Sequence, residues 1–117
     1  MSDFEKVKPV ILHDEDDGIS YTLEFTRESV KFAEQRGFDI NDVSRFPMTK
    51  LPELFFYAFR AHHKNVSRDK TDKILFEKMG GIPDGLIERL GQLYAVPFMA
   101  LTDEEGEAKN SRVTVEL

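Results

Sequence analysis

Apolar and polar side chains alternate strictly over residues 19–25, which is the clearest pattern in the chain. This alternation predicts a β-strand with four apolar residues on one face and Glu24 on the other: Ile19, Tyr21, Leu23 and Phe25. A short β-branched segment, residues 7–12, precedes it, and Asp17-Gly18 is a common tight-turn pair. The pattern therefore predicts an N-terminal β-hairpin over residues 7–25.

Helical spacing begins directly after the predicted hairpin. Thr26 is a good N-cap and Gly37 can adopt the left-handed C-cap conformation, so a first helix is expected to run to about Arg36. Val30 and Ala33 are predicted to face the core. Residues 38–48 show no sustained period and predict a connector whose apolar side chains pack against the core: Phe38, Ile40, Val43 and Phe46.

The most apolar helix is predicted to follow this connector, with Thr49 as its cap and Pro52 in its first turn. At 100° per residue, one broad face carries seven residues: Leu51, Leu54, Phe55, Ala58, Phe59, Ala61 and His62. His62 is therefore interpreted as a hydrogen-bonded core histidine. Phe56 falls outside this face, among charged residues, and is either an ordinary exposed side chain or a partner contact.

Two further helices are predicted in the second half of the chain. Ser67 is expected to cap a third helix that ends at Gly80-Gly81, with an apolar stripe of Thr71, Ile74, Leu75 and Met79. Pro83 suits the start of a fourth helix, whose predicted inner face carries Leu86, Ile87, Leu90, Leu93, Tyr94 and Phe98. Pro97 is expected to kink or end this helix, because proline removes one backbone hydrogen bond.

These elements predict an α+β fold in which the hairpin precedes a bundle of about four helices. Residues 1–101 are expected to form a single domain, with the hairpin over 7–25 and the helical part over 26–101. Residues 102–117 are polar, acidic and free of aromatic residues, which predicts a mobile tail.

Composition narrows the class of function. The net charge of −6 argues against general nucleic-acid binding, which depends on neutralising phosphates. The absence of cysteine excludes disulfides and thiolate metal sites. No apolar run approaches the roughly 18 residues of a membrane span, and the N-terminus has no signal-peptide character, so a cytoplasmic location is expected.

Charge is unevenly distributed along the chain. Residues 3–17 carry six acids, whereas residues 60–73 carry five bases. Two readings are open: these are solvated surfaces, or the basic segment meets an acidic partner such as the N-terminal turn of another copy.

Candidate chemistry is sparse. Residues 13–24 can be aligned with a calcium-binding loop through Asp17, Gly18 and Glu24, but His13 replaces the first carboxylate and the flanks predict strands. A solvated hairpin tip is the favoured reading. The adjacent His62 and His63 point in different directions on a helix and cannot share a metal ion. The sequence predicts no catalytic residue, no metal site and no cofactor, which favours a protein other than an enzyme.

A helix-turn-helix is the main alternative suggested by the basic segment. The second and third predicted helices are joined by the short turn Asn65-Val66, close to that segment. Asp69 and Asp72 would lie in the would-be recognition helix and repel phosphates. A small DNA-binding or anti-repressor protein is therefore kept as the alternative function.

The order of elements and three stretches of sequence resemble the tail assembly chaperones of long-tailed bacteriophages and related prophages. The stretches are YTLEFTRESVKFAE, LPELFFYAFRAHHKNVSRDK and the helix ending LGQLYAV, which together cover roughly residues 19–96. The resemblance implies a non-catalytic protein that coats the tape measure protein, helps recruit tail tube subunits and is absent from the finished virion. Many chaperones of this kind are also made in a second, longer form by ribosomal frameshifting, and the acidic tail would match the end of the short form.

A chaperone for an amphipathic helix needs an apolar strip or groove. Phe56, Val96 and Met99 fall outside the predicted core stripes and are the candidate apolar contacts. Three polar neighbours of Phe56 complete the predicted partner-binding set: Arg60, His63 and Lys64. Self-association along the tape measure protein, as a ring or an open spiral, is also expected.

Overall fold

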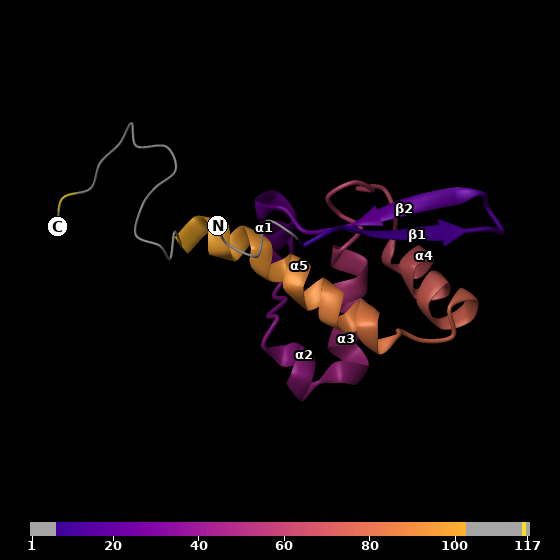
Figure 1. The fold of residues 1–117 in the computed structure, drawn as a ribbon. Helices are drawn as coiled ribbons and strands as arrows, with labels where there is room; N and C mark the ends of the chain where they lie inside the picture. Colours follow the sequence, from indigo (N-terminus) through magenta and orange to yellow (C-terminus); the bar gives the residue numbers. More distant parts are fainter. Residues whose placement is uncertain (1–6, 103–115, 117) are drawn as a thin grey trace.

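The structure, a computed structural model, describes residues 7–102 and residue 116. It consists of an antiparallel hairpin followed by helices, with the long helix α5 running beneath the hairpin and past the other helices (Figure 1). The elements are β1 (Val10–Asp14), β2 (Ile19–Leu23), α1 (Arg27–Gln35), α2 (Asp42–Arg45), α3 (Pro47–Tyr57), α4 (Arg68–Asp72), the π-helical segment η2 (Lys73–Lys78) and α5 (Asp84–Thr102). The predicted α+β fold with an N-terminal hairpin is confirmed.

The hairpin forms within the predicted boundaries, although β1 begins at Val10 and not at Val7. Leu12 lies opposite Tyr21, and Gly18 takes the positive φ of 69° that the turn requires. Tyr21, Leu23 and Phe25 are buried as predicted. Ile19 is 45% exposed, because it lies at the end of β2 next to the turn.

Capping residues define the first helix as the sequence predicts. The Thr26 hydroxyl accepts a hydrogen bond from the Ser29 N–H, and the Ser29 hydroxyl accepts one from the Thr26 N–H. Ala33 is buried and Gly37 follows the helix with a φ of 87°. These contacts fix the start and the end of α1, which forms one wall of the groove described below.

The connector between the first two predicted helices is more ordered than expected. It contains α2, and α3 begins at Pro47, two positions before the predicted cap Thr49, because proline is well suited to the first helical position. Phe38 is buried, but the prediction for Phe46 was wrong: this side chain is 52% exposed, and its ring lies beside the Arg45 guanidinium, 5.3 Å away.

Helix α3 ends at Tyr57, earlier than predicted, and this changes the assignment of both histidines. Residues 58–62 form turns, so helical spacing no longer applies to them. The interpretation of His62 as a core histidine was wrong: its side chain is 42% exposed and contacts the Glu24 carboxylate. His63 is the partly buried histidine instead.

The Ser67 cap and the Gly80-Gly81 stop are confirmed. The Ser67 hydroxyl accepts from the Lys70 N–H, and both glycines have positive φ. Between them, α4 passes directly into η2. Three residues of the predicted stripe, Thr71, Ile74 and Leu75, are buried, and the fourth, Met79, is partly buried.

Helix α5 departs from prediction in its C-terminal half. Leu90, Leu93 and Tyr94 are buried as expected. Phe98 is 61% exposed, so its assignment to the inner face was wrong; this end of α5 extends beyond the other helices (Figure 1). The helix also continues past Pro97 to Thr102, because a missing N–H at one position leaves the neighbouring backbone bonds available.

Buried aromatic and aliphatic side chains from the hairpin, α1, α3, η2 and α5 form one core around Phe55 and Phe59. No helix in residues 7–102 is long and apolar enough to cross a membrane. The predicted tail, residues 102–117, lies outside the described residues apart from the backbone of Thr102 and Glu116.

Candidate functional site

A groove of about 870 Å³ lies between α1, the segment that follows it and the C-terminal half of α5. Its walls are two helix faces, each with helical spacing: Arg27, Val30, Lys31 and Glu34 from α1, and Gly91, Tyr94, Ala95 and Phe98 from α5. Phe38 and Ile40 come from the connecting segment, and Leu101 extends the α5 wall. The volume is within the range of known ligand sites.

Small residues keep the groove open, and aromatic residues form its wall. Gly91 has no side chain and Ala95 has only a methyl group, so neither residue extends far into the groove from the α5 wall. The Tyr94 ring packs edge-on against Phe38 and Phe25, with centroid separations of 5.8 and 4.9 Å. Phe98 and Leu101, which are 61% and 66% exposed, leave an apolar surface at one end of the groove.

The α1 wall carries charges that form no ion pair within the described part of the chain. Within residues 7–102, Arg27, Lys31 and Glu34 form no ion pair. Unpaired charges beside an apolar surface are typical of an interface rim, where they set orientation and steer association.

None of the six residues predicted from sequence to bind a partner lines this groove. Phe56 is half-buried with its ring 5.1 Å from that of Tyr57, and the Arg60 guanidinium lies 3.9 Å from the centre of the Phe32 ring. Lys64 is exposed in the turns that follow. These residues cluster with His63 at the end of α3, whereas Val96 and Met99 are half-buried on α5. Their role as partner contacts stays a prediction.

Sequence reasoning missed the groove residues Phe98 and Leu101. Phe98 continues the apolar spacing of Leu90 and Tyr94 along α5. This spacing does not show how far along α5 the other elements pack, and Phe98 is exposed. The available signal was the polar composition directly after Leu101.

His63 ties the hairpin to the turn after α3. Its Nε2 accepts a hydrogen bond from the Thr22 N–H at 2.9 Å, and its ring lies edge-on to Tyr21 at 5.1 Å. Nε2 must therefore be unprotonated in the folded protein. Burial, with a smaller contribution from His62, lowers the pKa of His63 below its usual value of 6.5.

This arrangement predicts a pH dependence of stability. A lowered folded-state pKa gives a contribution that is complete above the unfolded value of 6.5 and is lost as the pH falls through the folded value. Glutamine can accept the same hydrogen bond but does not titrate, so the free energy of unfolding of His63→Gln should change less than that of wild type between about pH 7 and pH 5. Urea titrations measure this, with His13→Gln, at the exposed histidine of β1, as the control. Equal pH slopes for wild type and His63→Gln would contradict the assignment.

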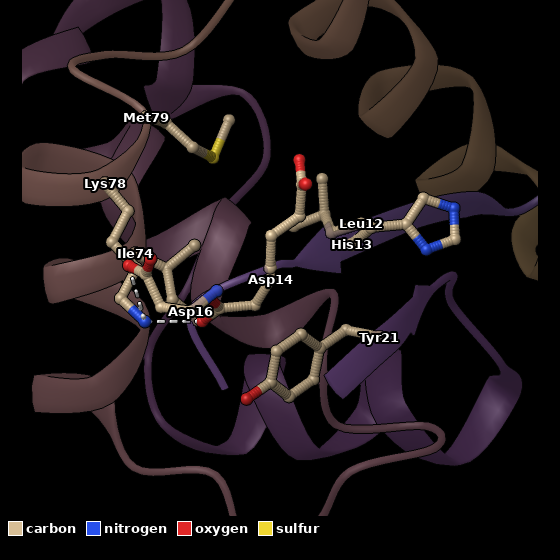
Figure 2. Close-up of a pocket in the computed structure, with 9 residues that line it drawn as sticks. Leu12, His13, Asp14, Asp16, Tyr21, Ile74, Lys78 and Met79 are labelled. Atoms are coloured by element: carbon tan, nitrogen blue, oxygen red, sulfur yellow. Dashed lines mark hydrogen bonds and ion pairs between the residues drawn. The ribbon is translucent and has the colours of Figure 1, made fainter. Parts of the chain in front are cut away.

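The hairpin tip that resembles a calcium loop is held by lysines of the same chain. Figure 2 shows Lys78 beside Asp14, and its Nζ lies 2.6 Å from the Asp14 carboxylate. The same Nζ lies 3.4 Å from the Asp17 carboxylate. Lys70 Nζ lies 2.8 Å from the Asp17 carboxylate. Among the described residues, no group of three or more His, Cys, Asp or Glu side chains could hold a metal ion. The Lys70 and Lys78 ammonium groups place positive charge at this tip.

These ion pairs give a second prediction on stability. Lys78 holds the pKa of Asp14 below its usual value of 3.8, and Lys70 does so for Asp17, so their contribution is complete above pH 3.8 and is lost as the pH falls through the folded values. Lys78→Met should lower the free energy of unfolding at pH 7 and raise the pKa of Asp14, which NMR titration measures. Lys73→Met, at an exposed lysine of the same segment, is the control. If Lys78→Met lowers the free energy of unfolding by the same amount below the folded-state pKa values of Asp14 and Asp17 as at pH 7, the ion pairs are not the cause of the loss.

Several bases of the basic segment, residues 60–73, interact with other residues of the same chain. Arg60 stacks on Phe32, Arg68 pairs with Asp72 and Lys70 pairs with Asp17. The connection between α3 and α4 spans residues 58–67 and is longer than the predicted turn. Fewer bases are therefore available to phosphates than the sequence indicates.

Comparison with known proteins identifies a family. Comparison with curated proteins and with solved structures found no match. The whole chain, residues 1–117, matches the family described as "Domain of unknown function (DUF5055)". The protein therefore belongs to this DUF5055 family.

Proposed function

We propose that this protein is a phage tail assembly chaperone that binds the tape measure protein and helps recruit tail tube subunits. Its role is non-catalytic. It acts in the cytoplasm of the bacterial host, associates with further copies of itself and is absent from the mature virion. The partner is inferred from the resemblance of residues 19–96 to these chaperones. The proposed contact surface is the groove between α1 and α5.

The observation that carries this proposal is the open apolar groove with exposed Phe98 and Leu101 at one end. An amphipathic helix binds such a groove by inserting side chains spaced three and four residues apart. The tape measure protein is a long helical protein in the family that the sequence resembles, so it offers helices of this kind. Large aromatic side chains that remain exposed next to a groove are typical anchors of such interfaces.

Groove length explains why many copies are needed. The α5 wall extends from Gly91 to Leu101, which corresponds to about 15 Å at 1.5 Å per residue. One copy can therefore cover only about three helical turns of its partner. Coating a long tape measure protein requires many copies side by side, and this agrees with the proposed self-association.

Co-expression with the tape measure protein encoded in the same genome tests this function. Size-exclusion chromatography with light scattering should show one complex that contains many copies of this chain per tape measure protein. A tape measure protein that precipitates while this chain elutes by itself would contradict the proposal. Salt-dependent retention on DNA is then the next test, because it decides the alternative DNA-binding reading.

A further inference from the structure

Tyr94 lines the groove, and its hydroxyl is a buried polar atom without a hydrogen-bond partner among residues 7–102. The Tyr94 side chain is 7% exposed, and its hydroxyl forms no hydrogen bond within the described part of the chain. Burial raises the pKa of Tyr94 to about 12, with smaller contributions from Glu34, Asp39 and Tyr57, so the hydroxyl keeps its proton and can donate. Buried tyrosine hydroxyls usually have a partner, so this one requires an explanation.

The surroundings of Tyr94 restrict what that partner can be. Phe25 and Phe38 hold the ring on two sides, and neither offers an acceptor in its side chain. Glu34 and Asp39 add negative charge near the hydroxyl, and Glu34 has no ion pair in residues 7–102. A carboxylate of the partner would be repelled by these two charges. A purely apolar side chain would leave the hydroxyl unpaired. A side-chain amide can accept from the hydroxyl through its oxygen and donate to a carboxylate through its NH₂ group.

We propose that the helix bound in this groove carries one Asn or Gln within its apolar stripe, and that its amide oxygen accepts a hydrogen bond from the Tyr94 hydroxyl. This inference rests on the proposed function, because it names the chemistry of the partner at the same groove. The hydroxyl is covered in the unbound protein, so binding includes a small opening of the groove. Tyr94 is then a specificity-determining residue.

A single buried polar pair gives the complex a defined register. Apolar contacts along a helix tolerate a shift by one turn, since the next turn offers similar side chains. A shift would leave both the amide and the Tyr94 hydroxyl buried without partners, which is disfavoured. The Tyr94 contact would therefore determine where each copy sits along the tape measure protein.

Tyr94→Phe tests this inference in the full chain. The variant keeps the ring and removes the hydroxyl, so its affinity for the tape measure protein should fall about 3- to 10-fold. The melting temperature of the unbound variant should stay the same or rise, because an unpaired buried hydroxyl is removed. Tyr21→Phe is the matched control: Tyr21 is 4% exposed but does not line the groove, so its hydroxyl should not affect affinity.

The partner gives the second half of the experiment. Each Asn or Gln within an apolar stripe of the tape measure protein is replaced by Leu and tested against wild type and Tyr94→Phe. One replacement should weaken binding to wild type but have no further effect on Tyr94→Phe. If wild type binds and Tyr94→Phe binds equally well or more tightly, the inference is wrong and the proposed function stands. If wild type does not bind the tape measure protein, the proposed function itself is contradicted.

Discussion

Replacing Phe98 by aspartate should strongly weaken the complex with the tape measure protein and leave the fold intact. The side chain is 61% exposed, so its removal costs the unbound protein little. In the complex it is the largest exposed apolar group at the groove, and aromatic anchors of this kind contribute about 2 kcal/mol or more. A buried, unpaired carboxylate adds a further penalty. We therefore expect affinity to fall by at least about 30-fold, measured by titration calorimetry or by loss of co-elution.

Phe76→Asp is the matched control for this variant. Phe76 is 57% exposed, on η2, and does not line the groove. Phe76→Asp adds the same charge at a similarly exposed position, so the affinity of this variant for the tape measure protein should stay within about twofold of wild type. Equal losses for both variants would indicate a general effect of charge, and the groove would not be the binding site.

Truncating Phe59 to alanine should remove a large part of the stability. Its side chain is 1% exposed, and its ring contacts Tyr21 of the hairpin at 5.3 Å and Phe55 of α3 at 5.1 Å. Loss of a fully buried Phe costs about 3–5 kcal/mol, which is a large fraction of the roughly 5–15 kcal/mol of a typical domain. The free energy of unfolding in urea measures this loss.

The exposed Phe76 again provides the comparison for Phe59. Phe76→Ala removes the same ring from the surface and should change the free energy of unfolding by no more than about 0.5 kcal/mol. A loss below about 1 kcal/mol for Phe59→Ala would mean that the hairpin does not depend on packing against the end of α3.

Local signals in the sequence were sufficient for most of the secondary structure. The alternation after Ile19 predicted β2, and Thr26 and Ser67 marked helix starts through contacts within four residues. Gly37 and Gly80 marked helix ends through their left-handed conformation. Each of these features is determined by neighbouring residues, so one sequence contains the information.

Features that depend on distant contacts could not be predicted in the same way. Helical spacing continued past Tyr57 in the sequence, but the chain turns there, and His63 takes the place expected for His62. The groove requires α1 and α5, which are far apart in the chain, to lie side by side. The exposure of Phe98 likewise depends on where the neighbouring helices end, which no local pattern records.

The central claim, that the groove binds a helix of the tape measure protein, is tested most directly by photocrosslinking. Benzoylphenylalanine placed at position 98 keeps an aromatic side chain at the groove, and placed at position 76 it samples a similarly exposed surface outside it. Irradiation of co-expressed complexes should link position 98, and not position 76, to the tape measure protein. Crosslinks from position 76 alone, or from both positions equally, would contradict the groove as the binding site.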